Sequence, residues 1–197
     1  MPLRVDLFCE DAAHEAVARA IVERLAAEEG IEVSIRVGSA RAGVGRLQTE
    51  LRAYTETTRR QGGTPDVLVV MIDANAEGPQ ARRDQVERSG LQAVFPRRVI
   101  GTPDPCVEAW LLADPQSLAD RYGRRPAASS SRDCDELKER LKTLLLDAGE
   151  TVTQGGAEFA DEIVGTMDLY RAGRSLPTLK RFVDELRASF RQHTAVR

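Results

Sequence analysis

Two hydrophobic patterns alternate along the first hundred residues of the chain. Short runs of apolar, often β-branched residues are separated by longer segments in which apolar residues recur every three or four positions. The first pattern is typical of buried strands, and the second of helices that cover a sheet. The predicted strands are 4–9, 31–37, 66–72 and 97–100, and the predicted helices between them are 12–29, 47–60 and 80–88. This alternation predicts an α/β fold with a mainly parallel four-stranded sheet flanked by helices.

In the second half of the chain the strand-like runs disappear and helical patterns take over. Helices are expected at 105–114, 133–146, 157–170 and 175–190, with an exposed loop over 124–132. We expect Asp104 to cap the first of these helices, with Pro105 in its first turn, and Ser175 to cap the last. The sequence therefore predicts an α/β core of residues 1–115 and a C-terminal helical extension of residues 116–197 packed on it.

Oxygen-bearing side chains follow two of the predicted strands at their carboxyl ends. Glu10 comes directly after the first strand, and Asp73 directly after the third, with Asn75 and Glu77 in the same loop. Taken singly, Glu10 and Asp11 are also typical of a helix start, and Asp73 and Asn75 of a turn. Open α/β sheets, however, bind ligands at this edge, where two strand ends converge. The pattern favours a site for a hard cation such as Mg²⁺ that polarises a phosphodiester, beside a Glu that moves protons.

Charge composition gives no general sign of nucleic-acid binding. The 197-residue chain has a formal net charge of −3, so contacts to phosphates would have to come from local arginines. Arg41 and Arg46 lie in or beside a glycine-rich loop, and Arg82 and Arg83 follow the Asp73 loop. Each of these four is a candidate phosphate contact, although each taken singly is more typical of a solvated surface arginine.

Cysteine content and hydropathy indicate the compartment of the protein, and the histidines bear on whether it binds zinc. The three cysteines, Cys9, Cys106 and Cys134, form no CxxC pair, which is typical of reduced thiols in a cytoplasmic protein. His14 has no second histidine at ligand spacing, so the pattern does not indicate a zinc site. No apolar run is long enough to span a membrane, and no signal peptide opens the chain. We expect a cytoplasmic protein without a membrane partner.

Several segments resemble a known family. Glu10 after an apolar strand, followed by Asp73-Ala74-Asn75 after the third strand, resembles the Toprim signature, a Glu and then an Asp-x-Asp. More closely, FCEDAAHEAV at 8–17 and EAWLLAD at 108–114 resemble a family of small Toprim-like proteins. Those proteins occur in bacterial defence and mobile-element neighbourhoods, often beside an ABC-type or overcoming-lysogenization-defect-type ATPase. The resemblance covers about residues 3–120.

The resemblance implies a Toprim-like fold and a nuclease that cleaves DNA or RNA with Mg²⁺ or Mn²⁺, as the effector of an ATPase partner protein. It assigns proton transfer to Glu10 and the first metal carboxylate to Asp73, which makes these two the expected catalytic residues. Glu10, Asp73 and Asn75 are the expected metal ligands. Asn75 stands where the signature has its second Asp, which leaves one negative charge fewer unless Glu77 substitutes for it. Glu108 is a candidate further metal ligand, with helix capping as the simpler interpretation.

Two other functions stay open at this point. A non-catalytic Toprim-like partner or regulatory subunit would keep the fold with a weakened metal site, as Asn75 and the net negative charge favour. A Mg²⁺-dependent nucleotide phosphotransfer or hydrolysis enzyme would use the same carboxylates on a smaller phosphate. The sequence also leaves open a homo-oligomer and the roles of Glu15 and Asp114, for which a helix surface and a helix cap are the simpler interpretations.

Overall fold

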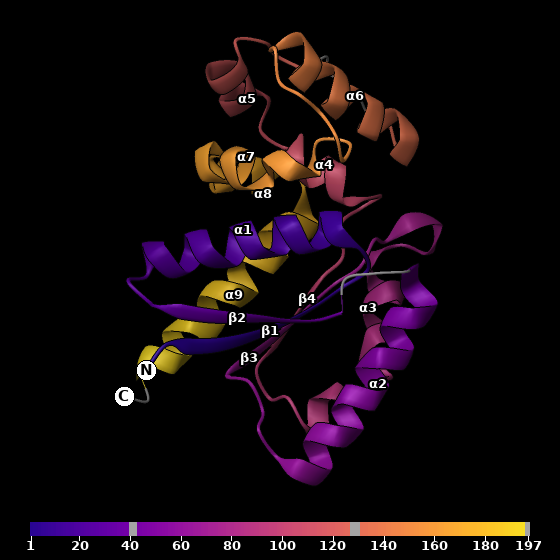
Figure 1. Ribbon diagram of the computed structural model, residues 1–197, viewed down its shortest axis with the longest axis vertical. Helices are drawn as coiled ribbons and strands as arrows, with labels where there is room; N and C mark the ends of the chain where they lie inside the picture. Colours follow the sequence, from indigo (N-terminus) through magenta and orange to yellow (C-terminus); the bar gives the residue numbers. More distant parts are fainter. Residues whose placement is uncertain (40–42, 127–130, 196–197) are drawn as a thin grey trace.

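The computed structural model describes residues 1–39, 43–126 and 131–195 and confirms the α/β class. Four strands form one sheet: β1 (Leu3–Cys9), β2 (Val33–Ser39), β3 (Val67–Met71) and β4 (Arg98–Gly101). Their order is β2-β1-β3-β4, and every pair is parallel (Figure 1). The long helices of the α/β part are α1 (Ala12–Glu28), α2 (Gly43–Gln61) and α3 (Pro79–Glu87). The predicted four-stranded parallel sheet flanked by helices is therefore confirmed.

Both faces of the sheet are covered, which explains the uninterrupted apolar run in β3. Successive side chains of a strand point to opposite faces. Val67 and Val69 pack in the cluster that contains α1 and α9 (Pro177–Ala195), whereas Leu68 and Val70 pack with residues of α2 and α3. A strand buried on both sides has no position for a solvated polar residue.

The remaining helices lie between β4 and α9 along the chain. They are α4 (Val107–Leu111), α5 (Pro115–Tyr122), α6 (Cys134–Asp147), α7 (Ala160–Thr166) and α8 (Leu169–Ser175). Three 3-10 turns complete the described elements: η1 (Asn75–Glu77), η2 (Leu91–Ala93) and η3 (Ala157–Phe159). α7 packs against α1, and α6 against α4, so these helices form a layer above α1 (Figure 1). Within the described residues no helix is long and apolar enough to cross a membrane.

The predicted helix 105–114 is wrong at both ends. Cys106, with an extended backbone, occupies the cap position of α4, and Pro105 lies before it in the connecting loop. The helix ends at Leu111, and Asp114 then caps α5, with Pro115 in its first turn. A proline is compatible with the first turn of a helix as well as with the residue after one. The expected cap at Asp104 and the helix end near Asp114 are therefore wrong, whereas the simpler interpretation of Asp114 as a helix cap is confirmed.

Two further boundaries differ from the prediction. Ser175 is the last residue of α8 and does not cap α9; its hydroxyl donates to the Ala172 carbonyl, one turn earlier. α2 begins at Gly43, four positions before the predicted start. Arg41, a candidate phosphate contact, lies outside the described residues.

The C-terminal extension shares its hydrophobic core with the α/β part. Trp110 of α4 is buried, packs against Phe182 of α9 with the rings tilted and their centroids 5.3 Å apart, and donates from Nε1 to Thr178 Oγ1 over 3.0 Å. Phe182 also packs so closely on β4 that a Cβ atom on Gly101 would lie 3.0 Å from its ring. α9 is therefore part of the cover of one sheet face.

Candidate metal centre

Glu10 and Asp73 meet at the carboxyl edge of the sheet. β1 and β3 are neighbours, with Cys9 paired to Met71, so the residues that follow both strands emerge side by side. The Glu10 N–H donates to the Met71 carbonyl over 3.0 Å, and the Asp73 N–H donates to Glu10 Oε2 over 3.1 Å. The structure thus brings together two carboxylates that are 63 positions apart in the chain.

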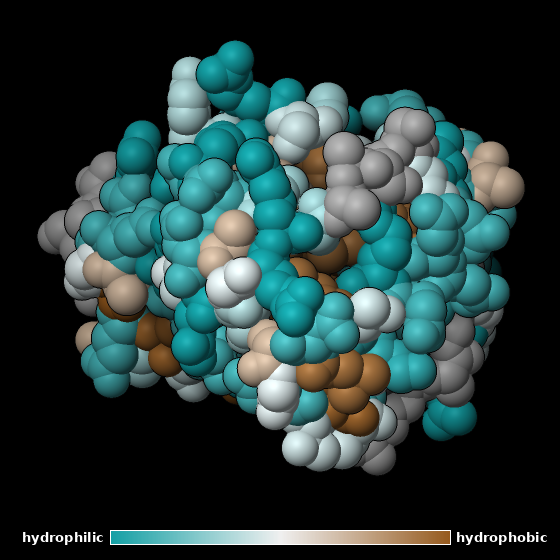
Figure 2. All heavy atoms as spheres, turned by 90° about the horizontal axis from the view of Figure 1, so that it is seen from above, coloured by the Kyte–Doolittle hydropathy of each residue, from teal (hydrophilic) through white to brown (hydrophobic). Residues whose placement is uncertain are grey.

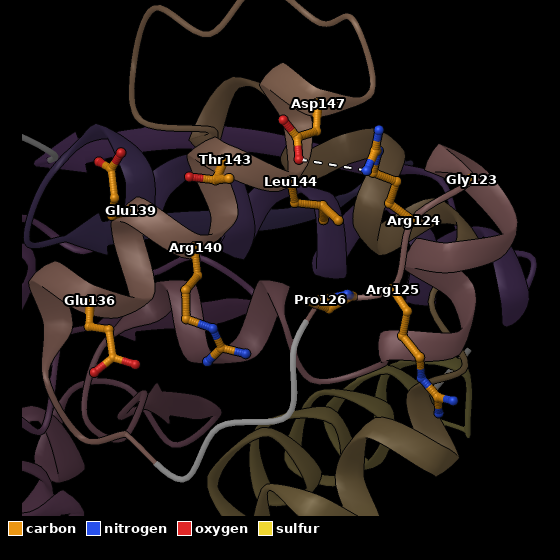
Figure 3. A pocket seen from close by; sticks show the side chains of 10 residues that line it. All are labelled: Gly123, Arg124, Arg125, Pro126, Glu136, Glu139, Arg140, Thr143, Leu144 and Asp147. Atoms are coloured by element: carbon orange, nitrogen blue, oxygen red, sulfur yellow. Dashed lines mark ion pairs between the residues drawn. The ribbon is translucent and has the colours of Figure 1, made fainter.

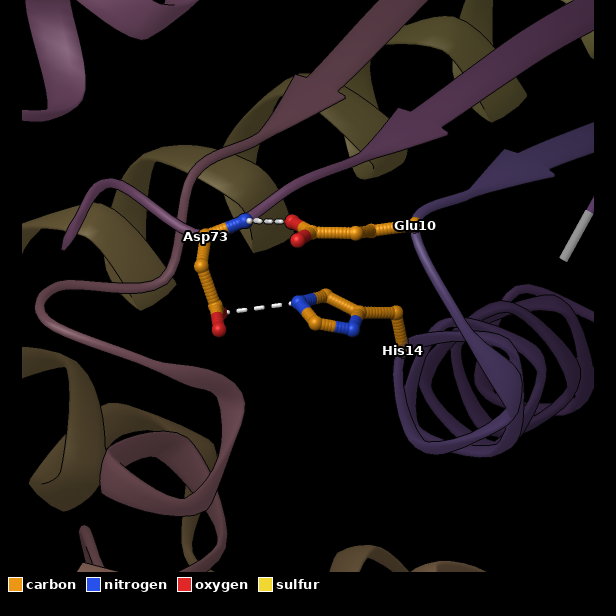
Figure 4. A group of neighbouring side chains, drawn as sticks. All are labelled: Glu10, His14 and Asp73. Carbon is orange, nitrogen blue, oxygen red and sulfur yellow. Dashed lines mark hydrogen bonds and ion pairs between the residues drawn. The ribbon is translucent and has the colours of Figure 1, made fainter. Parts of the chain in front are cut away.

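His14 is the third member of this cluster, and it lies in the first turn of α1. The N-cap residue Asp11 accepts the backbone N–H groups of Ala13 and His14 at Oδ1, over 2.9 and 3.0 Å. The same oxygen lies 2.7 Å from His14 Nδ1, and on the other side of the ring Nε2 lies 2.8 Å from Asp73 Oδ1 (Figure 4). One ligand atom each from Glu10, His14 and Asp73 lie within 4.8 Å of one another.

The charges in the cluster are strongly coupled. Burial alone lowers the pKa of His14, but hydrogen bonds to Asp11 and Asp73 and their negative charges outweigh it and raise the pKa to about 10. Burial raises the pKa of Glu10; the charge of Asp73 adds to this, while His14 and the Asp73 N–H oppose it. The protonated ring is therefore favoured, and in that form both nitrogens donate.

Asn75 begins the η1 turn on the same edge, with a left-handed backbone (φ 48°) and an exposed side chain. Its Oδ1 lies 3.8 Å from the thiol of Cys134, the first residue of α6. Burial raises the pKa of Cys134, and the charges of Asp73 and Glu108 raise it further. The start of α6 therefore lies close to both of these carboxylates.

Glu108 is buried on α4, and its Oε2 has no hydrogen-bond partner among the described residues. Its carboxylate is hydrogen-bonded to the Cys106 thiol and faces Lys138 of α6. Burial lowers the pKa of Lys138, but neighbouring negative charges, with Glu108 the largest, raise it overall. A buried carboxylate oxygen without a partner is costly, which marks Glu108 as a group that could bind a ligand at this edge.

Sequence reasoning missed His14 and Lys138. The spacing of His14 carried a usable signal, since it lies three residues after a helix-capping Asp and four after Glu10, which puts its ring on the same turn. Lys138 carried no such signal, because α6 reaches this edge only through the packing of the extension.

Arg46 is held within its own helix. It is exposed on the surface of α2 and pairs with Glu50 one turn later, over 2.7 Å. Glu15 makes a comparable pair with Arg19 on α1, over 3.0 Å.

The other two candidate arginines stabilise the position of α3. Arg82 is buried, with Nη atoms 3.1 Å from Glu77 and 2.7 Å from Gln85. Arg83 donates to both carboxylate oxygens of Glu185 on α9, over 2.8 and 3.0 Å. These guanidinium groups therefore have partners inside the protein, and Glu77, the suggested substitute ligand, is paired with Arg82.

Asp114 has a structural role. It is 1% exposed and accepts hydrogen bonds from the Arg171 guanidinium, the Ser117 hydroxyl and the Asp168 N–H. These contacts join the start of α5 to α8.

The face that carries α5 and α6 is mostly hydrophilic, with apolar side chains in small patches and in a hollow (Figure 2). A cavity of about 580 Å³ lies between the end of α5 and α6 (Figure 3). Arginines and acidic residues line it in a mixture, and Arg124 pairs loosely with Asp147 over 3.9 Å. None of its lining residues belongs to the Glu10–His14–Asp73 cluster.

Comparison with known proteins yields one match. Neither the curated proteins nor the solved structures contain a match to this chain. A family model described as "Domain of unknown function (DUF4276)" matches residues 9–187, a span that includes all three residues of the cluster. Because this match covers most of its length, the chain belongs to the DUF4276 family of domains of unknown function.

Proposed function

We propose that this protein is a nuclease that cleaves phosphodiester bonds of DNA or RNA with Mg²⁺ or Mn²⁺, on a Toprim-like fold. The observation that supports it best is the hydrogen bond between the Asp73 N–H and Glu10, which places two carboxylates at one edge of a parallel sheet. Ligands of open α/β sheets bind at this edge.

The donors present fit a divalent cation. Two carboxylates lie next to each other. Glu108 lies outside this cluster, but its charge acts on Cys134 as that of Asp73 does, and it has a buried oxygen without a partner among the described residues. Glu10 and Asp73 would hold the ion, with the Asn75 amide oxygen and Glu108 as further ligands. A bound Mg²⁺ or Mn²⁺ would polarise the phosphodiester and stabilise the leaving oxygen.

The protein's own groups would position and move the proton. Burial raises the pKa of Glu10, which makes its carboxylate a better proton acceptor than an exposed one. Its carboxylate is held by the Asp73 main chain, and the Asp73 carboxylate by His14, so both are fixed relative to the two central strands. This preorganisation reduces the cost of orienting the groups during the reaction.

Because segments 8–17 and 108–114 resemble a family of small Toprim-like proteins, we propose an ABC-type ATPase as the partner and a role as an effector in a bacterial defence system. The proposed compartment is the cytoplasm, where Cys9, Cys106 and Cys134 would stay reduced; all three are free thiols here.

One observation favours a second candidate, a non-catalytic Toprim-like subunit. The His14 ring is hydrogen-bonded to Asp11 and Asp73 at once, so its positive charge already balances part of the acidic cluster. A site neutralised in this way needs no cation to be stable.

A cleavage assay separates the two. The full chain is incubated with plasmid, single-stranded DNA and tRNA, in Mg²⁺, in Mn²⁺ and in EDTA. Glu10→Gln and Asp73→Asn are expected to reduce cleavage by about 100-fold or more, because each removes a charge from the site. Glu23→Gln on the exposed face of α1 and Asp84→Asn on α3 are the matched controls and should cleave like the wild type.

Two outcomes would argue against the nuclease. If both site variants still cleave, the chemistry lies elsewhere. The wild type also serves as bait in a pull-down from its native host. If it cleaves none of the substrates in either metal but retains an ATPase in the pull-down, the non-catalytic subunit is the better description.

A further inference from the structure

The His14 imidazole is enclosed at the sheet edge and aimed at the acidic pair. It is 2% exposed, and its Nε2 lies 2.8 Å from Asp73 Oδ1. In Figure 4 the side chains of Glu10 and His14 run next to each other toward Asp73. Two ligands about 2.1 Å from an octahedral ion, at right angles, lie about 3 Å apart. The separation between His14 and Asp73 is therefore that of two neighbouring ligands of one ion.

Asp11 fixes which ring nitrogen faces the pair. Its Oδ1 lies 2.7 Å from His14 Nδ1 and also caps α1 by accepting two backbone N–H groups. A histidine that binds a metal almost always donates its other ring N–H to a carboxylate or a carbonyl. The helix cap thus supplies the outer partner of a histidine ligand and leaves Nε2 toward Asp73.

We propose that His14 is a nitrogen ligand of this site and that it makes the site select Mn²⁺ over Mg²⁺. When the ion binds, Nε2 releases to solvent the proton that it otherwise donates to Asp73. Imidazole nitrogen suits first-row transition metals, whereas Mg²⁺ prefers oxygen ligands and keeps most of its waters. A set of one imidazole and two carboxylates therefore favours Mn²⁺ among the two ions considered. The inference rests on the proposed function, because it names the ion with which the same residues act.

Metal binding to the full-length protein, without any nucleic acid, tests the inference. After removal of metal with EDTA, titration calorimetry measures Mn²⁺ and Mg²⁺ affinities in one buffer. The wild type is expected to bind Mn²⁺ about tenfold tighter than Mg²⁺, or more. Pulsed electron paramagnetic resonance of the Mn²⁺ protein should show coupling to a directly bound nitrogen.

Two variants separate a ligand from a mere ion-pair partner. His14→Asp offers oxygen in place of nitrogen, so the nitrogen coupling should vanish and the preference for Mn²⁺ should fall to a few-fold. Asp11→Asn keeps a good helix cap but weakens the outer partner of the ring, and should lower Mn²⁺ affinity by about 10- to 100-fold. Glu23→Gln is the control on the same helix and should change neither quantity.

Wild-type protein that binds both ions equally, or nitrogen coupling that persists in His14→Asp, would overturn the inference. So would the absence of Mn²⁺ binding. Selective Mn²⁺ binding without cleavage of any substrate would support the inference and count against the nuclease. Cleavage of a substrate by a protein that binds both ions equally would support the nuclease and count against the inference.

Discussion

The main-chain N–H of Asp73 donates to the side chain of Glu10 over 3.1 Å, and this bond connects the ends of β3 and β1. The position of the Glu10 carboxylate therefore depends on the pairing of two central strands, and its charge contributes little to that pairing. Changes to the charge of Glu10 should affect ligand binding more than folding. A change to the charge of Asp114 should instead affect folding, because its side chain joins α5 to α8.

Glu10→Gln is expected to leave the free energy of unfolding unchanged or slightly higher at neutral pH, without added metal. The glutamine oxygen can still accept the Asp73 N–H, and the substitution removes a carboxylate whose charge is disfavoured by burial, as its raised pKa shows. Urea unfolding followed by the fluorescence of Trp110, the single tryptophan, measures it. A loss above about 1 kcal/mol, compared with Glu23→Gln, would show that Glu10 holds the fold together.

Asp114→Asn is expected to lower the free energy of unfolding by about 2–3 kcal/mol, because a buried amide NH₂ would then face groups that are all donors. Arg171, half-exposed at 47%, can partly turn to water, which keeps the loss below that of a fully buried pair. Asp120→Asn, at an exposed position of α5, is the control. Equal stability of the two variants would contradict a structural role for Asp114.

The contribution of Asp114 should disappear in acid. Burial alone raises its pKa, but Arg171, Ser117 and the Asp168 N–H outweigh burial and hold the pKa below the ordinary 3.8. A carboxyl group whose pKa is lower in the folded state stabilises the fold above its unfolded pKa and loses this effect as the pH falls through its folded pKa. Urea unfolding of the wild type and Asp114→Asn should therefore differ by a constant amount from about pH 5 to 7 and converge below about pH 4. A difference independent of pH down to the acid limit would contradict this origin.

Gly101→Ala and Gly45→Ala should change the free energy of unfolding in opposite directions. A Cβ on Gly101 would lie 3.0 Å from the Phe182 ring and 3.3 Å from Met71, so the alanine should cost about 1–3 kcal/mol. Gly45 lies on the exposed side of α2 with nothing within 4 Å of its would-be Cβ, so alanine should stabilise by about 0.5–1 kcal/mol. Thermal unfolding by circular dichroism measures both. A neutral Gly101→Ala would mean that α9 can shift away from the sheet at little cost.

The pattern of apolar residues predicts an element correctly where burial allows only one kind of composition. The apolar run that became β3 and the stripe that became α9 were recognised because burial requires that composition. The helix boundaries near Pro115 and Ser175 are predicted incorrectly, because proline and serine are compatible with the start of a helix as well as with its end. The intramolecular partners of Arg82 and Arg83, Glu77 and Glu185, do not follow from local order. A role for these arginines as phosphate contacts stays a prediction.

Local pattern predicts the four strands, the order of strands and helices along the chain, and the placement of Glu10 and Asp73 after two strands. Periodicity is a local property, and parallel strands must present their carboxyl ends on one edge. The packed fold alone places the His14 ring between Asp11 and Asp73 and brings Lys138 of α6 close to Glu108. Such contacts depend on how helices pack and on which charges then face each other at short distance, and these distances are set by the whole fold.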